Sequence, residues 1–131
     1  MYIHETQNWP NFTWNREQID AKLIKVSKAA GYLEGRMSAI GFDVQQQAAV
    51  EALTYDIVSS SEIEGVLLNS DQVRSSVARR MGVHITNETE PSHYIEGVVE
   101  MMLDAVNNYS SPLTDERLFG WHNCLFPTGR S

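Results

Sequence analysis

Residues 15–41, NREQIDAKLIKVSKAAGYLEGRMSAIG, carry the strongest periodic signal in the chain. Their apolar residues recur at alternating steps of four and three, a spacing that lines one face of a helix. These residues are Ile19, Leu23, Val26, Ala30, Leu33, Met37 and Ile40. Asn15 with Gln18 three residues later matches a helix-start pattern, and Gly41 is of the type that commonly ends a helix. The stretch therefore predicts one long helix that turns an apolar seam inward.

Two glycines interrupt this predicted helix. Gly31 and Gly35 each cost about 1 kcal/mol relative to alanine in a helix interior. We therefore expect them where another backbone packs closely against the helix.

Four further helices are predicted downstream. The second begins at Asp43, where Gln46 completes a capping pattern, and its inward residues Ala49, Leu53 and Ile57 follow at four-residue steps.

The remaining three helices are marked by their ends. Asn69 or Ser70 caps a third helix that Gly82 terminates, Ser92 caps a fourth, and Thr114 caps a fifth that runs to about residue 126. The residues of the fourth helix expected to face the core are Ile95, Val98, Val99, Met102 and Val106. The sequence thus predicts an all-α bundle of about five helices in one domain, residues 1–131, with an extended aromatic N-terminal arm, NWPNFTW.

Composition excludes several classes of protein. With 131 residues, 42% hydrophobic and 21% charged, the chain is of globular type rather than disordered. Its formal charge of -7 disfavours general binding to nucleic acid or anionic membranes. A single cysteine, no secretory signal and no apolar run of about 20 residues predict a cytoplasmic protein without a membrane span.

Residues that could carry catalysis are scarce. The four histidines show no spacing that would place two metal ligands on one helical face, so we expect no metal site. Gly31 and Gly35 form no phosphate loop, and Cys124 and His122 are two residues apart, which on a helix points them in different directions. No catalytic residue is therefore expected in this chain.

The third predicted helix is basic. Arg74, Arg79 and Arg80 could meet phosphates, but we favour a solvated face balanced by the acidic remainder of the chain. A nucleic-acid-binding module remains the weaker alternative.

The stretch SSSEIEGV, residues 59–66, lies where the second predicted helix ends. Local physics alone explains it as a helix end, with serines bonding back to carbonyls and Gly65 as the cap. Glu64, however, sits at the end of the helix where the dipole disfavours negative charge. Such a local misfit indicates a functional position.

Residues 60–65, SSEIEG, match the inhibitory pattern of Fic-domain proteins, which is Ser or Thr, three residues, then Glu followed by Gly or Asn. Further segments in the same order strengthen the match: WPNFTW, EALTYDIVSSSEIEG, VRSSVARRMG, YIEGVVEMMLDAVNNY and PLTDERLFGWHNCLFPTGRS. Over nearly its whole length the chain resembles the N-terminal helical region that precedes the catalytic core of bacterial Fic proteins.

The resemblance implies a role in AMPylation. Fic adenylyltransferases transfer AMP from ATP, with a divalent cation such as Mg²⁺, to a hydroxyl of a target protein. Their catalytic signature, HPFxxGNGR, does not occur in this sequence. We therefore expect this chain alone to bind no cofactor and to have no transferase activity, and its last helix, about residues 114–126, to lead into an absent Fic core.

The resemblance also assigns roles within the motif. Glu64 would pair with the second arginine of the signature, which otherwise holds the γ-phosphate of ATP. Ser60, one turn earlier, would support the same region by hydrogen bonding, and Gly65 would let the backbone turn away. Ile63 is expected to belong to packing.

The expected partner is a Fic catalytic core, in the same chain or in a separate one, with the target protein reached through that core. A stand-alone, antitoxin-like inhibitor of a separate Fic protein is the alternative. Bulky residues such as Trp121 and Phe126 near the end of the chain also predict an exposed apolar surface or a homo-oligomer.

Overall fold

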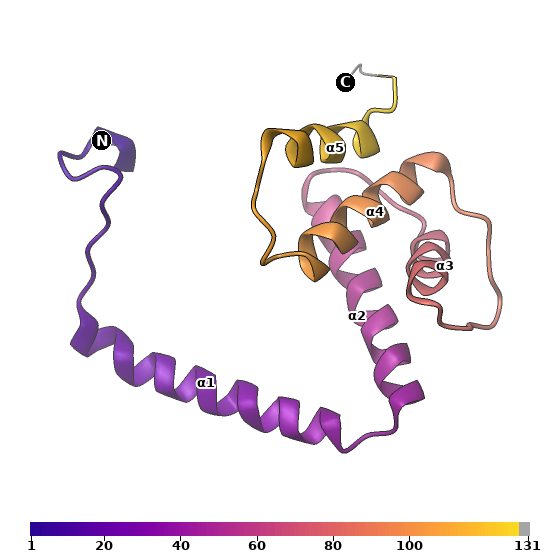
Figure 1. Ribbon diagram of the computed structural model, residues 1–131, viewed down its shortest axis with the longest axis horizontal. Helices are drawn as coiled ribbons and strands as arrows, with labels where there is room; N and C mark the ends of the chain where they lie inside the picture. Colours follow the sequence, from indigo (N-terminus) through magenta and orange to yellow (C-terminus); the bar gives the residue numbers. More distant parts are fainter. Residues whose placement is uncertain (129–131) are drawn as a thin grey trace. The chain divides into compact units, whose positions relative to one another are not determined.

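The computed structural model describes residues 1–128, which form helices joined by irregular segments (Figure 1). The elements are a 3₁₀ helix η1 (Ile3–Glu5) and the α-helices α1 (Arg16–Ser38), α2 (Phe42–Ile63), α3 (Ser70–Met81), α4 (His93–Asn107) and α5 (Asp115–Leu125). Helix accounts for 67% of the structure, and the described residues contain no strand. The prediction of an all-α fold with five helices is therefore confirmed. None of these helices is both long and apolar enough to cross a bilayer.

Contacts divide the chain into two compact units, although the sequence showed no internal boundary. The first unit is residues 1–41, and the second begins at Phe42.

The first unit consists of the N-terminal arm and α1. Asn15 caps α1 by accepting a hydrogen bond from the backbone N–H of Gln18, at 3.2 Å, as the sequence predicts. The helix ends at Ser38, and Ala39, which is still right-handed, donates its N–H back to the last turn. The predicted role of Gly41 is therefore wrong, because the helix ends earlier and the left-handed glycines of the described chain are elsewhere.

The apolar seam of α1 is not buried within its own unit. Leu23, Val26 and Leu33 are 54%, 65% and 61% exposed. A helix buries its seam only against a second element, and this unit holds only one long helix. The expected close packing at Gly31 and Gly35 is also not found, since a side chain at either position would meet open space.

The arm is aromatic and exposed, but it is not extended throughout. Its first residues, Asn8 to Pro10, lie in a turn that follows η1, and Trp9 packs edge-on against Phe12 with ring centroids 5.5 Å apart. Both rings and Trp14 remain largely exposed.

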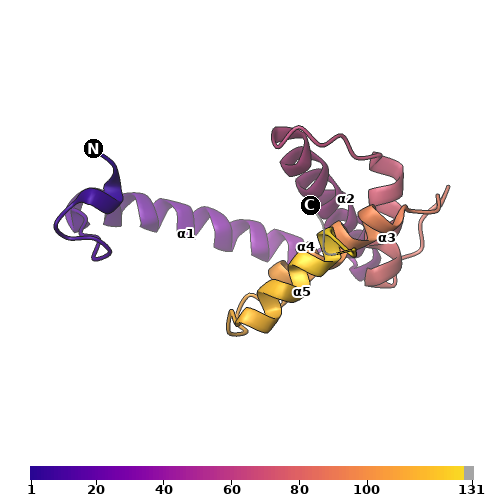
Figure 2. The same cartoon turned by 90° about the horizontal axis from the view of Figure 1, so that it is seen from above.

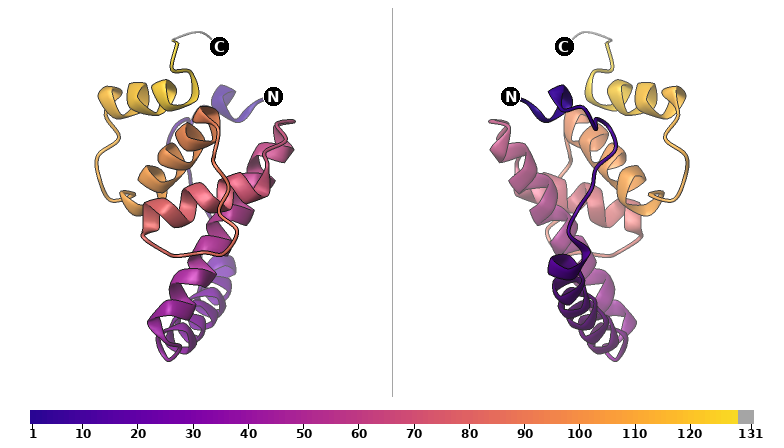
Figure 3. Two further views of the ribbon diagram at one scale, coloured as in Figure 1. Left: turned by 90° about the vertical axis from the view of Figure 1, so that its right-hand side faces the viewer. Right: turned by 90° about the vertical axis from the view of Figure 1, so that its left-hand side faces the viewer.

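The second unit contains the hydrophobic core. Helix α2 packs on α3, α3 on α4, and α4 on α5 (Figures 2 and 3). The core residues are mostly small and branched: Val50, Ile57, Val73, Val77, Ala78, Val83, Ile95, Val98 and Val99. Of the predicted inward residues, Ile57 is buried, Ala49 and Leu53 are half-buried, and Val106 is 46% exposed because it lies in the last turn of α4, beyond the core.

The predicted helix starts of this unit are confirmed by side-chain caps. Asn69, Ser92 and Thr114 each accept a hydrogen bond from the backbone N–H three residues later. Gly82 ends α3 in the left-handed conformation, with φ 69°. Helix α2 begins at Phe42, one residue before the predicted start at Asp43.

Helices α4 and α5 approach each other closely at Gly97. A Cβ atom at this position would overlap the backbone carbonyl oxygen of Cys124. Backbone cannot move aside as a flexible side chain can, so only glycine allows α5 to lie where it does. The tight packing that the sequence predicts for glycines of α1 is thus found in α4.

We expect Gly97→Ala to destabilise the second unit by roughly 1–3 kcal/mol, because the added methyl group forces α4 and α5 apart. Gly120→Ala in α5 is the matched control, since its Cβ would meet nothing within 4 Å and helix propensity would add up to about 1 kcal/mol. Urea unfolding followed by circular dichroism measures both. Equal stability of Gly97→Ala and the parent chain would contradict the close approach.

Candidate functional site

The end of α2 places Glu64 and Gly65 at a sharp reversal of the chain. The backbone N–H of Val66 donates to the carbonyl of Ser61 at 2.8 Å, and that of Gly65 donates to Glu62 at 2.9 Å. This pair of bonds is the Schellman arrangement, which needs a left-handed residue, and Gly65 supplies it with φ 80°. The sequence prediction that Gly65 turns the backbone away from the helix is therefore confirmed.

Ser60 and Glu64 lie one helical turn apart, as their spacing predicts. The backbone N–H of Glu64 points to the carbonyl of Ser60 at 3.4 Å, and both residues are exposed. The structure therefore brings together the two polar residues of the motif. Ile63, by contrast, is 83% exposed. The expectation that its side chain packs against other residues is therefore wrong within residues 1–128. Ile63 lies on the solvent side of the last turn of α2.

A groove of about 240 Å³ opens beside this helix end. We call it the Glu64 groove. Ser60, Ser61 and Glu64 supply its polar edge, and Ile57 lies at its base in the core. Its apolar walls come from the turn after α2 and from α4 and α5, and consist of Val66, Tyr94, Val98, Met101, Met102 and Leu125.

Glu64 is the single charged residue among the described residues that line the groove. Within residues 1–128 it has no ion pair. It also lies at the C-terminal end of α2, where the helix dipole disfavours negative charge. The site therefore presents an uncompensated carboxylate beside an apolar surface, an arrangement suited to a cation brought by another polypeptide segment.

The groove residues of α4 were only partly predicted from the sequence. Val98 and Met102 were expected to face the core, whereas Tyr94 and Met101 were not singled out. Tyr94, Val98 and Met101 recur at helical steps of four and three, so the same periodicity that marks the core could have indicated them.

A cluster of hydrogen bonds around Asp104 fastens α5 to α4 and so holds Leu125 in the groove wall. The Asp104 carboxylate accepts bonds from Arg117 Nε at 2.8 Å, Trp121 Nε1 at 2.7 Å and Asn108 Nδ2 at 2.7 Å. Arg117 also donates to backbone carbonyls at the end of α4 and lies over the Trp121 ring at 5.0 Å. Trp121 is accordingly half-buried rather than exposed. We call these four residues the Asp104 clamp.

These donors favour the charged form of the carboxyl group. The hydrogen bonds from Asn108, Arg117 and Trp121, in that order, lower the pKa of Asp104 to about 2. The Asp104 carboxyl group is therefore fully ionised at neutral pH. Sequence reasoning missed the clamp because a spacing of four pairs only Asp104 with Asn108 and Arg117 with Trp121, and the α4–α5 connection is needed to bring the two pairs together.

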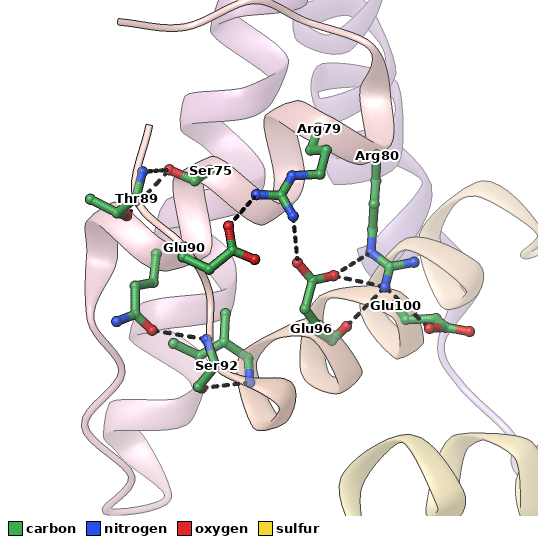
Figure 4. A network of polar contacts seen from close by, with 10 residues as sticks. Ser75, Arg79, Arg80, Thr89, Glu90, Ser92, Glu96 and Glu100 are labelled. Atoms are coloured by element: carbon green, nitrogen blue, oxygen red, sulfur yellow. Dashed lines mark hydrogen bonds and ion pairs between the residues drawn. The ribbon is translucent and has the colours of Figure 1, made fainter. Parts of the chain in front are cut away.

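Arg79 and Arg80 of α3 are held by carboxylates of the same unit (Figure 4). Arg79 pairs with Glu90 at 3.3 Å and with Glu96 at 3.8 Å. Arg80 pairs with Glu96 at 2.9 Å and with Glu100 at 3.2 Å. These contacts join α3 to α4 and to the segment between them.

Arg74 is paired with Glu51 of α2. The segment before α4 is also fastened to α3, because Thr89 N–H donates to Ser75 Oγ at 3.0 Å. The arginines of α3 therefore agree with the predicted face balanced by acidic residues. In residues 1–128, no group of three or more His, Cys, Asp and Glu side chains is arranged to hold a metal ion.

The fold and the groove define an all-α protein with an uncompensated carboxylate beside an apolar surface. Residues 2–83 match the model of a family described as a domain of unknown function, DUF4172. The match spans more than half of the chain, and the chain belongs to this family. It includes the Ser60–Glu64–Gly65 motif and ends before α4. A comparison with curated proteins finds no match.

The Asp104 clamp should weaken only in strong acid. Because its folded pKa lies below the unfolded value of about 3.9, the clamp's contribution to stability is complete above about pH 5 and falls as the pH is lowered further. It is lost as the pH falls through about 2. The NMR signal of the Trp121 indole N–H should follow this titration, and Asp104→Asn should abolish it. A midpoint near pH 4 would contradict the clamp.

We expect Gly65→Ala to cost about 1–2 kcal/mol, because a side chain is strained at φ 80°. Gly41→Ala is the control, since that glycine is not left-handed and its Cβ would meet open space. Thermal unfolding monitored by circular dichroism compares the two. A larger loss for Gly41→Ala would show that the left-handed turn is not what requires glycine at position 65.

Proposed function

We propose that the chain is the regulatory N-terminal segment of a Fic-type protein adenylyltransferase. In this proposal Glu64 pairs with an arginine of the catalytic core and so opposes productive binding of the γ-phosphate of ATP. The observation that carries the proposal is the exposed Glu64 residue, which lacks an ion pair within residues 1–128 and lines an apolar groove together with Ser60.

The inhibition follows from competition for one guanidinium group. Arginine binds carboxylates and phosphates through the same planar set of donors, so it cannot hold both in one place. Removing one partner of a buried charge pair often costs about 2–5 kcal/mol. A difference of that size against ATP would reduce the active population by one to several powers of ten.

ATP and Mg²⁺ would be held by the core rather than by this chain. The described lining residues of the groove include the Glu64 carboxylate and no cation, and the carboxylate repels a triphosphate. The three α3 arginines, which could otherwise attract phosphate, already face carboxylates of their own unit. The target protein would likewise be reached through the core.

The core can be part of the same polypeptide or a separate protein. Both arrangements use the same surface, so the structure of the chain favours neither. Reading the coding sequence beyond Ser131 distinguishes them. Continuation into HPFxxGNGR favours autoinhibition, whereas a stop codon beside a separate Fic gene favours an antitoxin-like inhibitor.

We expect Glu64→Ala, in the polypeptide or complex that contains both this chain and the Fic signature, to raise AMPylation at least tenfold. Labelled ATP with Mg²⁺ measures incorporation. Glu62→Ala is the matched control, because Glu62 is exposed two residues away and does not line the groove. Circular dichroism should show equal helix content for both variants. Equal incorporation by Glu64→Ala and the parent protein would contradict the proposal.

A further inference from the structure

We infer that the apolar part of the Glu64 groove is an anchoring site, separate from the blocking carboxylate, that takes a bulky apolar side chain of the Fic core next to its arginine. This inference rests on the proposed function and adds the chemistry of the contact. It divides inhibition between two neighbouring features: the groove holds the partner, and Glu64 blocks the phosphate position.

The need for an anchor follows from the exposure of Glu64. An ion pair between exposed side chains in water contributes little, because both groups remain hydrated and are screened by salt. The same pair becomes much stronger where surrounding apolar groups exclude water. Glu64 is exposed in this chain, so a strong contact with arginine requires that the partner also cover the groove beside it.

The groove has the size and surface for one such side chain. A cavity of about 150 Å³ accepts a benzene ring in an apolar protein interior. The Glu64 groove, at about 240 Å³, therefore has room for one aromatic or branched aliphatic side chain. Met101 and Met102 lie in its wall, and methionine adapts its shape to an incoming group.

The rim of the groove remains available for contact. Tyr94 is 41% exposed and Val66 is 37% exposed, so both have apolar surface that a partner would bury. Leu125, a further lining residue, is half-buried and lies on α5, which the Asp104 clamp fastens to α4. The partner would therefore bury the exposed surface of Tyr94 and Val66 against a groove wall that these hydrogen bonds hold in place.

The charge of the groove selects the partner. Glu64 is the single charge among its described lining residues, and Ser60 and Ser61 add hydroxyls on the same edge. The complement is one cation beside one apolar side chain. A second copy of this chain presenting the same groove would bring carboxylate against carboxylate, so a symmetric contact through this surface is disfavoured.

Thiol labelling tests whether the groove is covered. Val66→Cys and Leu67→Cys are introduced separately in a Cys124→Ser background, and reaction with iodoacetamide is timed. Leu67 is the control, because it is 83% exposed and does not line the groove. The isolated chain is compared with the polypeptide or complex that contains HPFxxGNGR. We expect labelling at position 66 to slow at least tenfold with the core present, and labelling at position 67 to change less than twofold.

Activity and labelling together separate the two claims. Adding Glu64→Ala should leave position 66 protected while AMPylation rises. Tyr94→Ala should raise AMPylation with Glu64 intact, whereas Tyr109→Ala, at an 83% exposed tyrosine outside the groove, should not. Circular dichroism of each isolated variant checks that it is folded.

Unchanged labelling at position 66 on addition of the core overturns the anchoring site, even if Glu64→Ala is activated. Protection at position 66 without activation by Glu64→Ala supports the anchoring site and overturns the blocking role of Glu64. Protection that depends on the concentration of the isolated chain would identify a second copy as the occupant and overturn the inference.

Discussion

The backbone reversal at Gly65 determines the position of Glu64, the single charged residue among the described residues that line the groove. Helix α2 ends at Ile63, and Gly65, with φ 80°, reverses the direction of the chain directly after Glu64. Val66 then becomes a wall of the groove, and Glu64 remains at its edge with Ser60 one turn below. A side chain at position 65 would oppose this turn. The short SSEIEG segment thus fixes both the carboxylate and the surface beside it.

The rest of the second unit supports this placement. The valine-rich core holds α2, α3 and α4 together, and ion pairs from Arg79 and Arg80 reinforce the α3–α4 contact. The Asp104 clamp and the close approach at Gly97 then fix α5 on α4. The groove depends on all of these contacts, because its walls come from α2, α4 and α5. On the proposed account, this rigid support is what lets one carboxylate compete with a phosphate group.

Local rules predicted the helices and their ends well. The caps at Asn69, Ser92 and Thr114 and the left-handed Gly82 follow from residue type and the next few residues. The same kind of signal correctly placed Ser60, Glu64 and Gly65 at the end of a helix. Local rules failed at Gly41, where the last turn of α1 is satisfied by bonds from Ala39 and needs no left-handed residue.

Features that depend on tertiary contact were not predictable in this way. The apolar seam of α1 is correctly spaced, yet spacing does not say which element will cover it, and most of its residues are exposed in their own unit. Gly97 lies in an ordinary helical pattern, and only the path of α5 shows why it has no side chain. Asp104 and Arg117 likewise come into contact only because the loop between α4 and α5 brings the two helices together. The groove itself is lined by residues from three helices. The sequence indicated only its polar edge as a site.

The most direct measurement is a crystal structure of the polypeptide or complex that contains both this chain and the HPFxxGNGR signature. The account predicts that the Glu64 carboxylate accepts two hydrogen bonds, at about 2.7–2.9 Å, from the guanidinium group of a core arginine. A Glu64 side chain directed into bulk water, away from any arginine, would contradict it.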